Sequence, residues 1–77
     1  MEFDKEVDAR GLNCRLPILR CKKGLSEIEA TQVLKVMATD KGAVKDFNAF
    51  CQQTGHELLH LDTVDGVFTF YIKKRSS

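Results

Sequence analysis

The stretch Gly11-Leu12-Asn13-Cys14-Arg15-Leu16-Pro17-Ile18 joins a segment with the pattern of a strand to a segment with the pattern of a helix. Side chains in residues 3–10 alternate between two faces, which is typical of a half-buried strand. Gly11, at the end of this segment, can turn the chain sharply without a steric penalty. The stretch therefore predicts a strand-to-helix turn that presents Cys14.

A stripe of apolar side chains predicts a helix that begins near Pro17. The stripe consists of Ile18, Cys21, Leu25 and Ile28, three or four residues apart. Proline is tolerated in a first helical turn, and Asn13 or Cys14 is expected to cap the helix. Gly24 within the helix costs about 0.5–1 kcal/mol relative to alanine.

A second strand and a second helix follow. Residues 33–38 form a short apolar run without clean alternation, which indicates a central strand. Asp40 is the expected N-cap of a helix that ends near Gly55. The apolar face of that helix is predicted to contain Ala43, Val44, Phe47, Phe50, Cys51 and Thr54.

The carboxyl-terminal part is predicted to be a hairpin around Asp65-Gly66, a typical type I′ turn sequence. Pairing Val64 with Val67 sets the expected register of the strands. One apolar face then contains the pairs Thr63–Phe68, Leu61–Phe70 and Leu59–Ile72, whereas His60, Asp62, Thr69 and Tyr71 lie on the other. Residues 73–77 are expected to form a frayed polar tail.

The predicted order is strand, helix, strand, helix, strand, strand. A right-handed crossover should make the first two strands parallel. We therefore expect one α+β domain over residues 1–77, a two-layer sandwich with two helices on one face of a four-stranded mixed sheet.

Composition excludes several classes of protein. The chain has 77 residues, 43% hydrophobic and 30% charged, with a net charge of +1, and this balance disfavours a nucleic-acid-binding protein. Its first residues lack an apolar signal region, and no apolar run is long enough to span a bilayer. We expect a cytoplasmic monomer that binds neither a membrane nor, directly, a nucleic acid.

The three cysteines do not form a familiar disulfide or zinc pattern. A chain without a signal peptide is not expected to rely on disulfides. Cys14 and Cys21 are seven residues apart, outside the usual spacing of a zinc ligand pair, and we expect no metal or other cofactor. Cys21 and Cys51 fall on the apolar helix faces, so they are predicted core residues.

Cys14 is the candidate reactive group. A helix start favours the thiolate, and Arg15, with Arg10 or Arg20, could add positive charge. Alternatively, Cys14 packs as a small hydrophobic residue, and position alone leaves both interpretations open. Cys21 lies about two helical turns further on, roughly 10 Å away, beyond disulfide reach.

The segment from Asp8 to Leu19 resembles the signature of the TusA/SirA/YedF family of sulfur carriers. Their motif is Cys-Pro-x-Pro after an Asp-x-x-Gly approach, and the resemblance continues through residues 33–40 and the Asp65-Gly66 hairpin. It implies a fold like the C-terminal domain of translation initiation factor three. It also implies that Cys14 carries sulfane sulfur as a persulfide, in a turn formed by Arg10, Gly11, Asn13, Arg15 and Pro17.

The partners implied by the resemblance are a cysteine desulfurase or related persulfide donor and a downstream acceptor protein. In one branch of the family the sulfur ends in 2-thiouridine of transfer RNA; in others it enters sulfur oxidation or molybdenum-cofactor metabolism. Whether such a carrier counts as an enzyme is a matter of definition.

The chain departs from the family pattern at three places. Arg15 replaces the first proline of the motif, and neither the glycine common near Thr31 nor the proline common near Lys41 is present. We expect Arg15 to change how firmly the turn is held more than whether Cys14 can carry sulfur.

Two other functions compete with the carrier hypothesis. A binding module could use a basic rim for a protein or RNA partner, formed by Arg10, Arg15, Arg20, Lys22 and Lys23. A thiol oxidoreductase would need a resolving thiol near Cys14, and the sequence offers no evident one.

Overall fold

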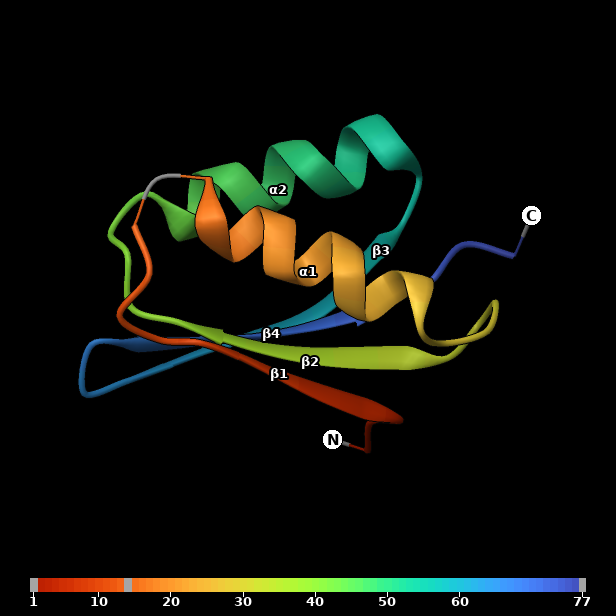
Figure 1. Cartoon of the computed structure of the whole chain (residues 1–77), viewed down its shortest axis with the longest axis horizontal. Helices are drawn as coiled ribbons and strands as arrows, with labels where there is room; N and C mark the ends of the chain where they lie inside the picture. The colour runs from red at the N-terminus through yellow and green to blue at the C-terminus, as the bar shows by residue number, and fades with distance from the viewer. Residues whose placement is uncertain (1, 14, 77) are drawn as a thin grey trace.

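The computed structural model describes residues 2–13 and 15–76 and contains the predicted series of elements (Figure 1). The strands and helices are β1 (Lys5–Ala9), α1 (Leu16–Ser26), β2 (Val33–Ala38), α2 (Ala43–Thr54), β3 (Glu57–Val64) and β4 (Val67–Lys73). The α+β assignment is confirmed.

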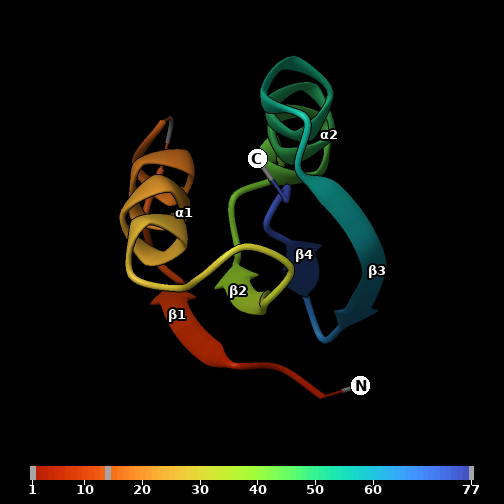
Figure 2. The same ribbon diagram turned by 90° about the vertical axis from the view of Figure 1, so that its right-hand side faces the viewer.

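The four strands form one mixed sheet in the order β1-β2-β4-β3. β1 and β2 are parallel, and β4 pairs antiparallel with both β2 and β3. Both helices cover the same face, side by side, and the other face of the sheet carries no helix (Figures 1 and 2). The central position predicted for residues 33–38 is therefore confirmed.

The core lies between the sheet and the two helices. Alternate residues of β2, Leu34, Val36 and Ala38, are fully buried against the helices. Phe47 of α2 stacks on Phe70 of β4, with ring centroids 4.2 Å apart. Buried apolar area is the main source of stability in a domain of this size.

Gly24 lies where α1 approaches the sheet most closely. A Cβ atom at this position would lie 2.7 Å from Cγ2 of Val7 and 3.0 Å from Cδ1 of Leu34. The glycine therefore permits the close contact between α1 and the β1–β2 pair. This packing role offsets the intrinsic cost of glycine in a helix.

The helix caps differ from those predicted. The N-caps are Arg15 and Gly42, and neither makes a side-chain capping bond. Asn13 and Asp40 contribute only backbone carbonyls, which accept hydrogen bonds from the N–H groups three residues later. Asn13 and Asp40 lie too early to be N-caps because each helix begins later than expected; capping by Cys14 lies outside the described residues. At the end of α2, Gly55 adopts φ +84° and confirms the predicted C-cap.

The hairpin has the predicted turn but an altered register. Asp65 and Gly66 have φ values of 51° and 78°, which are the positive angles of a type I′ turn. The Thr63–Phe68 and Leu61–Phe70 pairs are confirmed, but Leu58 rather than Leu59 lies opposite Ile72. A bulge between Leu58 and His60 causes the shift. Leu59 instead lines a shallow hollow together with Phe3, Asp4 and Val33.

The segment after β4 is anchored through Arg75. Lys73 belongs to β4, and the backbone of Lys74 exchanges hydrogen bonds with Thr31 and Gln32. The Lys74 ammonium donates to the Ile28 carbonyl at 2.7 Å. Arg75 donates to the Thr54 carbonyl at 3.0 Å. The prediction of a frayed tail is therefore wrong for residues 73–75, because Lys73 lies in β4, Lys74 binds the Ile28 carbonyl in the loop after α1, and Arg75 binds the Thr54 carbonyl at the end of α2.

Candidate functional site

The turn between β1 and α1, described for residues 10–13 and 15, lies at the carboxyl ends of the parallel strands β1 and β2 (Figure 1). Gly11 has φ +80° and donates its N–H to Oγ1 of Thr39 at 2.8 Å. Leu12 donates to the Ala9 carbonyl at 3.3 Å. Thr39, the residue after β2, thus ties the first part of the turn to the neighbouring strand.

Sequence reasoning missed Thr39. The signal that could have revealed it is the parallel arrangement of the first two strands, because residues that follow parallel neighbours meet at the same edge of a sheet. Open α/β sheets commonly place their functional loops at this edge.

Arg10 is held by Asp8. Its backbone N–H, Nε and Nη2 all donate to the Asp8 carboxylate, at 3.1, 2.9 and 3.0 Å. Hydrogen bonds from the Arg10 side chain and backbone lower the pKa of Asp8 to about 2, and the same contact raises the pKa of Arg10. The charge of Arg10 is therefore balanced locally, so its expected contribution to a thiolate at position 14 is reduced.

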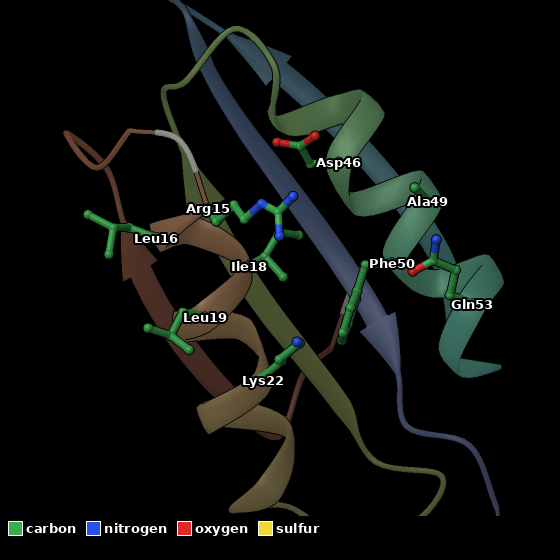
Figure 3. Close-up of a pocket in the computed structure, with 9 residues that line it drawn as sticks. All are labelled: Arg15, Leu16, Ile18, Leu19, Lys22, Asp46, Ala49, Phe50 and Gln53. Carbon is green, nitrogen blue, oxygen red and sulfur yellow. The ribbon is translucent and has the colours of Figure 1, made fainter.

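Arg15 caps α1 and extends over a groove between the two helices (Figure 3). The groove has a volume of about 800 Å³; Ile18 and Phe50 contribute its apolar surface, and Asp46 of α2 faces α1. Arg15 lines this groove, whereas Arg20, the next arginine along the chain, is exposed and does not.

Apolar side chains border the groove on the outer side of α1. Leu16 and Leu19 are 48% and 61% exposed, although both are leucines on a helix that otherwise buries its apolar stripe. In Figure 3 they point away from α2. The amino-terminal half of α1 therefore presents apolar and basic groups to solvent.

Pro17 anchors the first turn of α1. Its ring is fully buried, and proline is tolerated here because it lacks a donor that would have no partner within the helix. This first turn contains no acidic residue. The positive end of the helix dipole is therefore not offset by a carboxylate on the same turn.

The two described cysteines are buried core residues. Cys21 is fully buried and Cys51 is 6% exposed. Burial raises the pKa of Cys21 to about 12 and that of Cys51 to about 11. Their predicted core positions are confirmed, whereas Cys14, the predicted reactive residue, lies outside the described residues.

His60 Nε2 lies 2.9 Å from Asp62 Oδ1 on the uncovered face of the sheet, which is the face that the sequence pattern predicted for both residues. The pair forms because residues two apart on a strand share a face.

Residues 2–13 and 15–76 hold no cluster of three or more potential metal ligands. The helices there are also too short or too polar to cross a membrane.

The order of elements defines a class of protein, the two-layer α/β sandwiches, and the sequence of this chain has a cysteine between the first strand and the first helix. A family model described as sulfurtransferase TusA matches residues 5–74. The chain therefore belongs to the TusA family.

Individual relatives agree with this assignment. A sulfur carrier protein TusA of Allochromatium vinosum is 58% identical over 73 residues, covering 95% of this chain and 96% of the relative. A putative sulfur carrier protein of Bacillus subtilis, YrkI, is 45% identical and covers 96% and 99% of the two chains. The crystal structure of a SirA-like protein from Desulfitobacterium hafniense has a TM-score of 0.80 at 23% identity, covers 95% of this chain and 100% of its own, and confirms the fold.

Proposed function

We propose that this chain is a sulfur carrier that holds sulfane sulfur as a persulfide on Cys14. The Cys14 thiolate attacks the outer sulfur of a donor persulfide, a new S–S bond forms, and the donor cysteine leaves as a thiolate. An acceptor thiolate then attacks the outer sulfur on Cys14, and the Cys14 thiolate is released. Each transfer is balanced without an external oxidant or reductant.

The observation that carries this proposal is the state of the other two cysteines. Sulfur transfer requires an accessible thiolate, and Cys21 and Cys51 are buried with pKa values of about 12 and 11. At neutral pH both are protonated and enclosed by the core. By elimination, the carrier activity named in the relatives is assigned to Cys14.

The surroundings of the turn support a negatively charged sulfur there. Arg15 directly follows Cys14 and is the N-cap of a helix whose first turn contains no acid. A persulfide has a low pKa and is an anion at neutral pH, so a helix amino end favours it. Arg10 is paired with Asp8, which leaves Arg15 as the arginine that we assign to the carrier site.

The donor is proposed to be a cysteine desulfurase or another persulfide-forming protein, and the acceptor a second protein with a reactive thiol. Formation of 2-thiouridine in transfer RNA is the proposed end of this relay. Leu16, Leu19 and Ile18 provide apolar contact area beside the turn for such protein partners.

Intact mass measurement tests the proposal. The chain is incubated with a cysteine desulfurase and cysteine and is then analysed without reductant. We expect a gain of one sulfur atom, complete loss of this gain in Cys14→Ser, and an unchanged gain in the matched control Cys51→Ala. Failure to gain sulfur from several desulfurases would contradict the proposal and favour a non-catalytic binding module.

A further inference from the structure

A second hollow lies at the opposite end of the helix layer from the β1–α1 turn. It has a volume of about 440 Å³ and combines the carboxyl-terminal halves of α1 and α2 with the segment after β4. The residues that line it are Lys22, Leu25, Ser26, Phe50, Thr54, His56, Lys74 and Arg75. Four of these residues are basic and none is acidic.

The basic groups retain donors for a ligand. Lys74 uses one ammonium hydrogen on the Ile28 carbonyl, and Arg75 uses Nη1 on the Thr54 carbonyl. An ammonium group has three donors and a guanidinium has five, so both have donors left. None of the ion pairs within residues 2–13 and 15–76 includes Lys22, Lys74 or Arg75.

His56 adds a neutral donor. Its Nδ1 accepts a hydrogen bond from the Arg75 backbone N–H at 3.1 Å, so Nε2 carries the proton in the neutral ring. Burial and the nearby charges of Arg75 and Lys74 lower the pKa of His56. Burial is the larger cause, and the two cations add to it because both charges lie close to the ring.

The hydroxyl groups do not add donors. Ser26 Oγ donates to the Lys23 carbonyl at 2.6 Å, and Thr54 Oγ1 donates to the Phe50 carbonyl at 2.7 Å. Glu57 lines an adjacent hollow with Lys74 and Arg75, but it is not among the residues that line this one. The lining residues with donors left for a ligand are thus the three cations and His56.

We propose that this hollow binds a phosphate monoester, with the phosphate between Lys22, Lys74 and Arg75 and the apolar part of the ligand against Leu25 and Phe50. A phosphate monoester carries nearly two negative charges at neutral pH and three strong acceptor oxygens. Arginine and lysine together provide planar and point-charge contacts for such a group. The site is independent of Cys14 and goes beyond the carrier function.

The test is an NMR titration of the full ¹⁵N-labelled chain with inorganic phosphate and, separately, with uridine monophosphate. Sodium chloride at matched ionic strength provides the control for screening. We expect saturable shifts of the Lys74 and Arg75 amides and a rise in the pKa of His56 with both phosphates. Binding of uridine monophosphate should be tighter than that of phosphate, because the nucleoside adds contacts with Leu25 and Phe50.

Two neighbouring lysines give a matched pair of variants. Lys22 lines the hollow and Lys23 does not, although both are exposed residues of the same helix. Lys22→Gln should weaken uridine monophosphate binding by about three- to tenfold, whereas Lys23→Gln should leave it unchanged. Cys14→Ser should bind as the native chain does, so this result is separable from sulfur loading.

Three results would overturn the proposal. Equal weakening by the two lysine variants would show general charge attraction instead of a site. Shifts that match those in sodium chloride would show screening alone. Tighter binding of a uridine dinucleotide, whose bridging phosphate is a diester, would contradict the assignment to a monoester.

Discussion

The two ends of the helix layer are built differently. At the amino end of α1, the N-cap Arg15 makes no side-chain capping bond, and Gly11 is linked through its N–H to Thr39. At the carboxyl ends, the Lys74 side chain binds the Ile28 carbonyl just after α1, the Arg75 side chain binds the Thr54 carbonyl at the end of α2, and the Gly55 N–H donates to the Cys51 carbonyl. Long-range side-chain contacts thus concentrate at the end away from the β1–α1 turn.

This difference shows how a small domain combines stability with chemistry. Unsatisfied helix carbonyls cost free energy, and Arg75, which follows β4, satisfies the carbonyl of Thr54 at the end of α2. The first turn of α1 contains no acid, so no carboxylate of that turn competes with an anion there, and Asp46 of α2 lines the same groove as Arg15 (Figure 3). The following predictions test this contrast between the carboxyl ends of the helices, which side chains of Lys74 and Arg75 hold in place, and the amino end of α1.

The largest effect is expected at Gly24, where α1 approaches the sheet. Gly24→Val should destabilise the chain by about 2–3 kcal/mol, because its added carbons would overlap Val7 and Leu34. Ala49→Val, at an exposed position within α2, should cost only about 0.5 kcal/mol. Urea unfolding followed by circular dichroism measures both. Similar losses for the two variants would show that Gly24 has no packing role.

A smaller loss of stability is expected from a substitution at the carboxyl ends of the helices. Lys74→Met removes the charged hydrogen bond to the Ile28 carbonyl and should lower the free energy of unfolding by about 1–2 kcal/mol. Lys45→Met changes the same charge at an exposed position of α2 and should have little effect. The midpoints of urea unfolding are measured for the two variants. Equal midpoints would show that the hydrogen bond of Lys74 does not contribute to stability.

Thr31 offers a gain in stability at the same end. It has φ +70°, an unfavourable angle for a β-branched residue, and its N–H donates to the Lys74 carbonyl. Thr31→Gly should raise the free energy of unfolding by about 0.5–1 kcal/mol, because relief of strain exceeds the added entropy of the unfolded chain. Thermal unfolding measures the change. A lower midpoint would mean that the threonine side chain stabilises this turn.

The smallest effect is expected at Arg15. Its φ of −86° lies about 20° from the preferred angle of proline, so Arg15→Pro fits the backbone with little strain. Sulfur loading should stay within about twofold of the native rate, since the variant removes one exposed charge and adds rigidity. The rate of mass gain with a desulfurase tests this. Abolished loading would show that Arg15 is required.

Much of the fold was predictable because its signals are local. The apolar spacing of α2, Gly55 at its end and the Asp65-Gly66 turn each specify one element, and all three predictions are confirmed. The bulge at Leu59 was not predictable, because alternation alone suggested a regular strand. The contacts of Lys74 and Arg75 join residues 46 and 21 positions apart, so local patterns could not reveal them.

The candidate site was only partly predictable. The motif identified the turn and the family, and spacing placed Cys21 and Cys51 in the core. The pairing of Arg10 with Asp8 was missed, although residues two apart at the end of a strand can share a face. The role of Thr39 depends on the parallel pairing of β1 and β2 and required the three-dimensional arrangement.

The most direct test of the central claim locates the transferred sulfur. The native chain is loaded with a desulfurase and cysteine, alkylated with iodoacetamide and digested with trypsin, which releases Cys14 within residues 11–15, apart from Cys21 and Cys51. The account predicts one extra sulfur on the Cys14 peptide, with Cys21 and Cys51 alkylated only after denaturation. Sulfur on Cys21 or Cys51, or an unmodified Cys14 peptide, would contradict it.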